Sequence, residues 1–148
     1  MPEFFPQISR IEYAGPDSRD AFTFKHYNAV ETVGDKTMAE HLRFSVAYWH
    51  TFCGVGVDPF GVGTAVRPWN EGDSPMKAAE KKLQAAFELF TKLGVPYYCF
   101  HDRDIAPEGR NLAETNANLE KICRQALQMQ KDTGVKLLWG HPNVGERW

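Results

Sequence analysis

Hydrophobic residues recur with a helical period between positions 74 and 94. Ser74 and Pro75 are typical of a helix N-cap and first turn, and Gly94 is typical of a left-handed C-cap. The apolar residues on one face of this segment are Ala79, Leu83, Ala86, Phe87, Phe90 and Leu93. The spacing therefore predicts an amphipathic helix that packs this face against a core.

A second helix of this kind is predicted from Asn111, with Glu114 three positions later, to Gly134. Its apolar face carries Leu119, Ile122, Cys123, Ala126 and Met129. Each helix is followed by a short apolar run without alternation, at residues 95–100 and 135–139, as expected of strands covered on both faces. The order helix, strand, helix, strand predicts an α/β fold with a parallel sheet.

The earlier part of the chain is harder to assign. Residues 37–40 have the Thr-x-x-Glu pattern of a capping box, which predicts a helical turn. In residues 43–52 the apolar spacing fits a helix, whereas the Val, Tyr, Trp and Thr content favours a strand, and the pattern does not decide. Residues 1–36 are predicted to be irregular, and residues 54–72 form a long apolar loop of a length that is often functional.

The composition is that of a single globular domain. Of the 148 residues, 43% are hydrophobic and 24% are charged, with a formal net charge of −2. There is no basic block to follow a nucleic-acid backbone, no apolar run near the roughly 20 residues needed to cross a membrane, and no signal-peptide pattern. Cys53, Cys99 and Cys123 lack metal-ligand spacing, which predicts reduced thiols and a cytoplasmic location.

The apolar run at 95–100 leads into the most informative residues, His101-Asp-Arg-Asp104. Ligands of α/β proteins bind at the carboxyl ends of parallel strands, where His101 is expected to lie. An imidazole titrates near neutral pH and transfers protons best when a carboxylate fixes its tautomer, which Asp104 could do. The alternative is a core histidine bonded to backbone, with Asp102 and Asp104 in a solvated turn.

Aromatic residues make up 13% of the chain. If residues 44–52 also form a strand, three strand ends place Trp49, His101 and Trp139 at one edge of the sheet, the aromatic rim. The apolar face of a sugar can pack on an indole ring, so the aromatic rim predicts a ring-shaped ligand. Core packing is the alternative explanation of these aromatics.

Four stretches of the chain resemble the xylose isomerases, specifically the longer bacterial-type class. They are His41-Leu-Arg-Phe-Ser-Val-Ala-Tyr-Trp-His-Thr-Phe52, Asp58-Pro-Phe-Gly61, Leu93-Gly-Val-Pro-Tyr-Tyr-Cys-Phe-His-Asp-Arg-Asp-Ile-Ala-Pro-Glu-Gly109 and Thr133-Gly-Val-Lys-Leu-Leu-Trp-Gly140. The resemblance extends over almost the whole chain. It implies that residues 1–148 are the amino-terminal part of one TIM (β/α)8 barrel domain, about three βα units. Strands are then expected at 44–49, 96–100 and 135–138, between the irregular segment 1–36 and an atypical tail at 141–148.

The resemblance implies interconversion of D-xylose and D-xylulose, with D-glucose as an alternative substrate, by ring opening and a hydride shift. His101 corresponds to the histidine that assists ring opening by acid–base transfer, and Asp104 to the aspartate that orients it. Trp49 and Trp139 correspond to aromatic walls of the sugar pocket. Phe60 corresponds to a phenylalanine that enters the active site of a neighbouring subunit in a homotetramer. The alternatives are that both tryptophans fill barrel layers and that Phe60 packs under its own loop.

The resemblance also implies two divalent metal ions, usually Mg²⁺, with Mn²⁺ or Co²⁺ as alternatives. Their ligands lie on later strands of a longer chain, and a complete barrel needs roughly 250 residues, so no metal ligand is predicted here. Asp102, Asp104 and Glu108 would make at best a weak, exposed site, and Glu146 is the one carboxylate side chain after Gly140. The tail also lacks the Thr-Ala-Asn that follows Trp-Gly in the family.

Two functions fit the sequence. One is a xylose isomerase, and the other is a non-catalytic barrel fragment that binds sugar weakly or associates with full-length subunits. A small metallohydrolase using His101, Asp102 and Asp104 is disfavoured, because three ligands in four consecutive positions rarely converge on one ion. Strands cut from a barrel leave open edges and a bare apolar face, so the isolated chain is expected to associate or aggregate.

Overall fold

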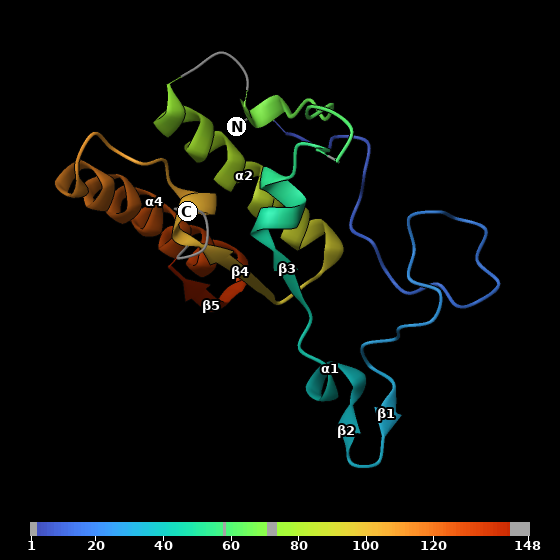
Figure 1. The fold of residues 1–148 in the computed structure, drawn as a ribbon. Coiled ribbons are helices and arrows are strands. Elements are labelled where there is room, and N and C mark those ends of the chain that lie inside the picture. The colour runs from blue at the N-terminus through green and yellow to red at the C-terminus, as the bar shows by residue number, and fades with distance from the viewer. Residues whose placement is uncertain (1–2, 58, 71–73, 143–148) are drawn as a thin grey trace.

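The computed structural model describes residues 3–57, 59–70 and 74–142 (Figure 1). Their strands are β1 (Thr32–Val33), β2 (Lys36–Thr37), β3 (Ser45–Ala47), β4 (Tyr97–His101) and β5 (Lys136–His141). Their helices are α1 (Met38–His41), the π-helical turn η1 (Trp49–Cys53), the 3₁₀ turn η2 (Pro68–Asn70), α2 (Pro75–Leu93), α3 (Asp102–Ile105) and α4 (Leu112–Thr133). No helix among the described residues is long and apolar enough to cross a membrane.

The predicted parallel sheet is confirmed. Its strand order is β3-β4-β5, and both neighbouring pairs are parallel. In the central strand β4 the three consecutive residues Tyr98, Cys99 and Phe100 are buried, which explains why its sequence shows no alternation. The fold of this chain is therefore α/β with a parallel sheet, and the described residues do not close into a barrel.

Both long helices have the predicted caps. Ser74 accepts a hydrogen bond from the Lys77 N–H group, and Gly94 ends α2 with φ +67°. In α4 the side chain of Asn111 accepts from the Glu114 N–H group, and Gly134 ends the helix with φ +77°. These ends are encoded locally, which is why the sequence predicts them closely.

The core lies between the sheet and the two long helices, which run side by side in Figure 1. Phe87 and Phe90 of α2 lie 5.3 and 5.2 Å from Tyr98 of β4, measured between ring centroids. Ile122 and Ala126 of α4 belong to the same buried cluster. Because Tyr98 and Phe100 face the helices, the alternate residues Cys99 and His101 lie on the opposite face of the sheet. We call this the open face because α2 and α4 do not cover it, although Cys99 itself is buried there.

The ambiguous segment 43–52 contains both of the predicted structures. Residues Ser45–Ala47 are the strand β3, and residues Trp49–Cys53 form the helical turn η1. The strand expected at 44–49 is therefore too long, and Trp49 lies in the turn after it. The sequence pattern was ambiguous because this short segment contains the end of a strand and the start of a helical turn.

Other boundaries also differ from the predictions. The strand expected from 95 or 96 to 100 begins at Tyr97 and includes His101, and Asp102–Ile105 form the turn α3 instead of a loop. The last strand does not stop at Leu138 or Trp139 but continues to His141. Pairing with β4 lengthens this strand, with a register irregularity between Tyr98 and Cys99, and such long-range pairing is not visible in local sequence. Of the expected atypical tail, residues 143–148 lie outside the described residues.

The amino-terminal segment is held on α2 by Glu88. Its carboxylate accepts hydrogen bonds from the N–H groups of Phe4 (2.7 Å) and Phe5 (2.8 Å) and lies 3.0 Å from the Lys92 ammonium. Further along, the Ile11 N–H group donates to the carbonyl of Lys92. The hairpin β1–β2 and α1 project away from the sheet and long helices (Figure 1), with the capping box predicted at Thr37 and Glu40 in place.

We expect Glu88→Ala to release the first residues from α2 and to lower the free energy of unfolding by about 1.5–3 kcal/mol at pH 7. Burial opposes the charged carboxylate, but the Phe4 and Phe5 N–H groups and Lys92 outweigh it and lower the pKa of Glu88. This stabilisation is complete above the ordinary value of 4.5 and is lost as the pH falls through the lower folded pKa. Urea unfolding of wild type and Glu88→Ala at pH 7 and in acid measures the loss of stability and its dependence on pH.

Glu120→Ala is the matched control, because Glu120 pairs with Arg124 on the solvent side of α4 and 63% of its side chain is exposed. Its effect is expected to be small at either pH. Equal losses for both variants, or a Glu88→Ala effect that persists in acid, would contradict the assigned role of Glu88.

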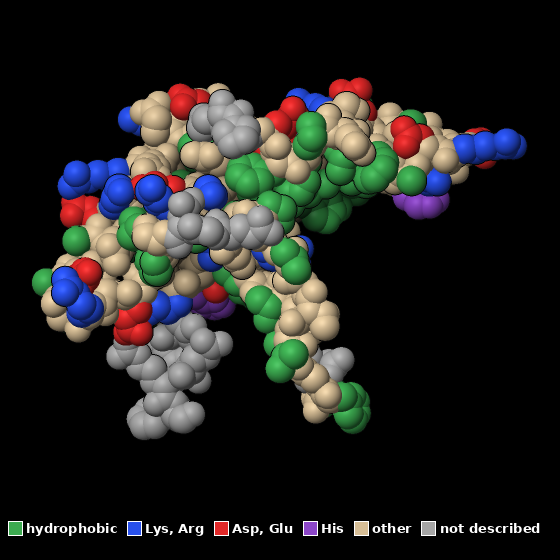
Figure 2. All heavy atoms as spheres, turned by 90° about the horizontal axis from the view of Figure 1, so that it is seen from above, with side chains coloured by type: hydrophobic (Ala, Val, Ile, Leu, Met, Phe, Trp, Pro, Cys, Tyr) green, Lys and Arg blue, Asp and Glu red, His purple; other side chains and the backbone are tan. Residues whose placement is uncertain are grey.

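Large hydrophobic side chains stay exposed on this chain. Figure 2 shows hydrophobic side chains (green) at the surface of the face that it draws. Those on the loop after η1 are Val55, Val57, Phe60, Val62 and Val66, and those on β5 are Leu137, Leu138 and Trp139. All six residues of β5 are exposed. Single exposed hydrophobic residues are normal, but three consecutive ones on an exposed strand mark a surface suited to contact with other protein.

Candidate functional site

His101 and Asp104 form a hydrogen-bonded pair at the carboxyl end of β4. One carboxylate oxygen of Asp104, Oδ2, lies 2.7 Å from the backbone nitrogen of His101 and 3.0 Å from ring nitrogen Nδ1. The turn α3 makes this possible, because it brings the third residue after the strand back over the strand end. A carboxylate only accepts, so Nδ1 carries the proton and the neutral ring offers its Nε2 lone pair.

The structure brings two tryptophans against this histidine. Ring centroids of His101 lie 4.6 Å from Trp49 and 5.8 Å from Trp139, and the two indoles lie 5.4 Å apart. Trp49 comes from η1 and Trp139 from β5, so three separate elements build the aromatic rim. The side chain of His101 is 30% exposed and that of Asp104 is 12% exposed, so the pair is open to a ligand but partly screened from water.

Phe60 is not packed in this cluster. It lies in the loop after η1, and 96% of it is exposed. It therefore does not pack under its own loop, which was the alternative explanation for this residue. Its contact with a neighbouring subunit stays a prediction, as do the roles of Trp49, His101, Asp104 and Trp139.

Cys53, which is partly buried, supports the turn that carries Asp104. The thiol of Cys53 lies 3.5 Å from the carbonyl oxygen of Asp104 and 3.4 Å from the ammonium nitrogen of Lys82. Burial raises the pKa of Cys53 despite the nearby Lys82, so this thiol stays protonated at neutral pH and supports structure more than chemistry. Tyr48, fully buried beside it, also has a raised pKa, mainly because of burial.

One residue of the site was missed by the sequence analysis. His141 pairs in register with His101, and their ring centroids lie 6.1 Å apart. The prediction ended the strand before this residue and assigned it to an atypical tail. The available signal was the period of two between Trp139 and His141, which places both side chains on one face of a strand.

The described residues do not fit a pair of magnesium ions. They contain no group of three or more His, Cys, Asp or Glu side chains placed to hold a metal ion, and this also gives no support to the metallohydrolase. The acids after β4 already have partners: Asp104 binds His101, Asp102 accepts from the Arg103 N–H group, and Glu108 binds the Arg103 guanidinium. Glu146 lies outside the described residues.

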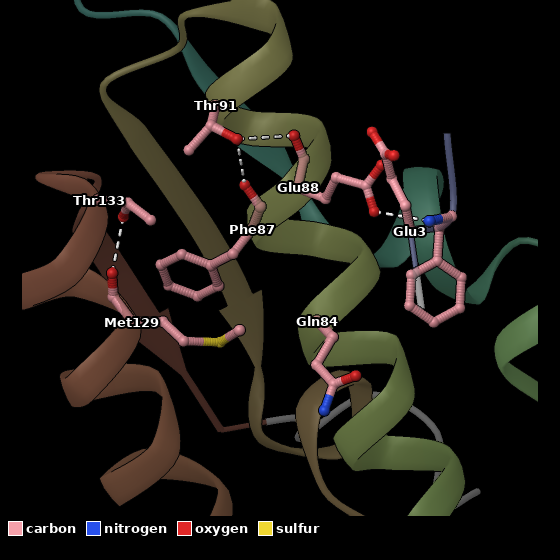
Figure 3. A pocket seen from close by; sticks show the side chains of 8 residues that line it. Glu3, Gln84, Phe87, Glu88, Thr91, Met129 and Thr133 are labelled. Carbon is pink, nitrogen blue, oxygen red and sulfur yellow. Dashed lines mark hydrogen bonds between the residues drawn. The ribbon is translucent and has the colours of Figure 1, made fainter. Parts of the chain in front are cut away.

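A pocket of about 420 Å³ lies elsewhere, between α2, α4 and the amino-terminal segment (Figure 3). Its hydroxyl groups are used within the helices: Thr91 donates to the carbonyls of Phe87 and Glu88, and Thr133 to that of Met129. Glu88 holds the amino-terminal segment there. None of the residues lining this pocket belongs to the aromatic rim, and Glu88, Thr91 and Thr133 serve local structure, so the rim is the better candidate site.

The parallel sheet and the histidine–aspartate pair at the end of β4 define an α/β protein with a candidate ligand site at the carboxyl edge of its sheet. No protein-family model matches the chain. Over 142 residues it is 56% identical to Xylose isomerase 1 of Xanthomonas axonopodis pv. citri (strain 306), covering 96% of this chain and 32% of that protein. It is 54% identical over 140 residues to the xylose isomerase of Rhodopirellula baltica (strain DSM 10527 / NCIMB 13988 / SH1), covering 95% of this chain and 32% of that protein.

The resemblance to xylose isomerases is thus confirmed over almost the whole of this chain. The chain spans about a third of the length of the curated relatives it matches. The similarity therefore covers the whole candidate site described above but only a part of those enzymes.

Proposed function

We propose that this chain is part of a xylose isomerase and supplies the residues that open the sugar ring. The observation that supports this is the His101–Asp104 pair packed against both Trp49 and Trp139, in a chain 56% identical to xylose isomerases. In this proposal β3, β4 and β5 begin a TIM (β/α)8 barrel, and the open face of the sheet, which carries Cys99 and His101, turns toward its interior.

The proposed chemistry follows from the tautomer of His101. A cyclic aldose lies against the indoles with its anomeric hydroxyl at Nε2, which removes the O1 proton. The bond between C1 and the ring oxygen breaks as the C1=O1 bond forms, and the imidazolium returns the proton to the ring oxygen. Asp104 holds the ring by Nδ1 and stabilises its positive charge during the transfer.

The proposal assigns ring opening alone to this chain. In the family the hydride shift uses two divalent metal ions, and the described residues do not fit them. The aldose is D-xylose, with D-glucose as the alternative. Exposed Phe60 would reach a neighbouring subunit of a tetramer, and the location would be cytoplasmic.

A second candidate is a non-catalytic fragment that binds sugar weakly or associates with full-length subunits. It is favoured by two observations together: the described residues hold no group of three or more His, Cys, Asp or Glu side chains placed to bind a metal ion, and every residue of β5 is exposed. An assay of D-xylose isomerisation with Mg²⁺ or Mn²⁺ separates the candidates. Activity of the 148-residue chain that is lost in His101→Asn supports the enzyme, and no activity above that variant supports the fragment.

Ring opening is tested separately by mutarotation, because interconversion of α- and β-D-xylose opens the ring without any hydride shift. We expect the chain to accelerate mutarotation, and His101→Asn to lose most of this acceleration, since general acid–base catalysis typically contributes about 10²–10⁴-fold. Polarimetry after dissolving one pure anomer measures the rate. His50→Asn, an exposed histidine beside Trp49, is the control and should keep the wild-type rate. A His101→Asn rate equal to that of wild type would overturn the proposed role.

A further inference from the structure

Two histidines lie side by side on the open face of the sheet. His101 ends β4 and His141 ends β5, and they are direct register partners in parallel strands. Neighbouring strands are about 4.8 Å apart, so partners in register present their side chains next to each other. The rings are nearly perpendicular, at 86°, with centroids 6.1 Å apart.

Both rings are held in the same tautomer. Nδ1 of His101 lies 3.0 Å from a carboxylate oxygen of Asp104, and Nδ1 of His141 lies 2.6 Å from the carbonyl oxygen of Pro142. Both oxygens can only accept, so each Nδ1 carries a proton when the ring is neutral. Each histidine is thereby left with an unprotonated Nε2, the form that binds a metal ion.

We propose that His101 and His141 form a two-imidazole site for a borderline divalent transition metal ion such as Ni²⁺ or Zn²⁺. Histidines that bind metal through one nitrogen usually donate the other N–H to a carboxylate or backbone carbonyl, and here both do. With bonds of about 2.0–2.1 Å, two imidazoles on one tetrahedral ion have centroids about 5 Å apart, which a small side-chain rotation from 6.1 Å reaches.

The site differs in kind from one for magnesium. Imidazole nitrogen suits Zn²⁺, Ni²⁺ and Cu²⁺, whereas Mg²⁺ requires oxygen ligands in near-octahedral geometry. The described residues give no third His, Cys, Asp or Glu placed to complete the set, so water fills the other positions. The site stands on the geometry of β4 and β5 and does not depend on the proposed isomerase activity. A metal ion there would occupy the His101 nitrogen that ring opening requires.

Equilibrium dialysis of the untagged 148-residue chain against NiCl₂ and, separately, MgCl₂ tests the proposal. We expect saturable binding of one Ni²⁺ per chain and no binding of Mg²⁺. Loss of the hydrogen-bond partner of a metal-binding histidine lowers metal affinity by about 10–100-fold. The Ni²⁺ affinity of Asp104→Asn should therefore fall by this factor, and that of His141→Asn, which loses a ligand, by at least as much. His26→Asn, an exposed histidine of the amino-terminal segment, is the control and should bind as wild type does.

A second measurement avoids substitutions altogether. Paramagnetic Ni²⁺ added in small amounts to the wild-type chain should broaden the NMR signals of two of its five histidine rings, His101 and His141, before the others. Circular dichroism confirms that each variant is folded. Unchanged Ni²⁺ affinity in folded His141→Asn, or broadening spread evenly over all five histidines, would overturn the proposal.

Discussion

Phe90→Ala is expected to remove a large part of the free energy of unfolding of this chain. Phe90 is fully buried, and its ring lies 5.9 Å from Phe52, 5.4 Å from Phe87 and 5.2 Å from Tyr98. It thus joins η1, α2 and β4 in one cluster. Truncating a buried phenylalanine costs about 3–5 kcal/mol, and small domains unfold at a cost of only about 5–15 kcal/mol. Because its sheet has open edges, we expect the free energy of unfolding of this chain to lie near the lower end of this range.

Urea unfolding followed by circular dichroism measures the loss as a shift of the midpoint at constant slope. Phe22→Ala is the matched control, because it removes the same atoms from a side chain that is 57% exposed, and we expect a change within about 0.5 kcal/mol. A Phe90→Ala variant as stable as the control would show that this aromatic cluster is not the core of the fold.

The parts of the fold that the sequence predicted well are those governed by local interactions. Ser74, Gly94, Asn111 and Gly134 define the helix ends by capping and backbone preference within a few residues. The apolar face of α2 follows from the helical spacing of its hydrophobic residues, which can be read directly from this segment of the sequence. Residues near one another in the chain decide these features, so neither tertiary contacts nor the sheet are needed to predict them.

The features that were missed depend on distant residues. Pairing with β4 carries β5 on to His141, past the point where its apolar run ends. The first residues are fixed by Glu88, more than 80 positions away in sequence, through hydrogen bonds at Phe4 and Phe5. Trp49 reaches His101 from η1, a π-helical turn that periodicity alone does not separate from the preceding strand.

The candidate site combines both kinds of information. The His101–Asp104 pair is local, because the two residues are three positions apart, and the sequence predicted that one could orient the other. The tryptophans that contact His101 belong to two other elements, η1 and β5. We expected this contact because the carboxyl ends of parallel strands lie at the same edge of a sheet. His141 was not predicted as part of the site, because the predicted strand ended before it and pairing with β4 extends β5 to this residue.

The second large effect is expected at β5. This strand pairs only with β4 among the described residues, and Leu137, Leu138 and Trp139 are each more than a third exposed. Charged residues on edge strands prevent strand-to-strand association in natural sheets, whereas the middle of this strand has three consecutive hydrophobic residues after Lys136. We expect the wild-type chain to self-associate at micromolar concentration and Leu138→Lys to shift it toward monomer.

Burying a leucine side chain contributes about 1.5–3 kcal/mol, and each 1.4 kcal/mol is about tenfold in affinity, so the dissociation constant should rise at least about tenfold. Sedimentation velocity across a range of concentrations measures it. Leu127→Lys adds the same charge at an exposed position of α4, away from the sheet edge, and should not change association.

The result also bears on the two candidate functions. If wild type associates and Leu138→Lys is monomeric, the open sheet is a binding surface, which is what a fragment that joins full-length subunits requires. A wild-type chain that is a stable, cooperative monomer at micromolar concentration would contradict the expectation that the exposed strand β5 is a binding surface, and the fragment hypothesis would lose this support.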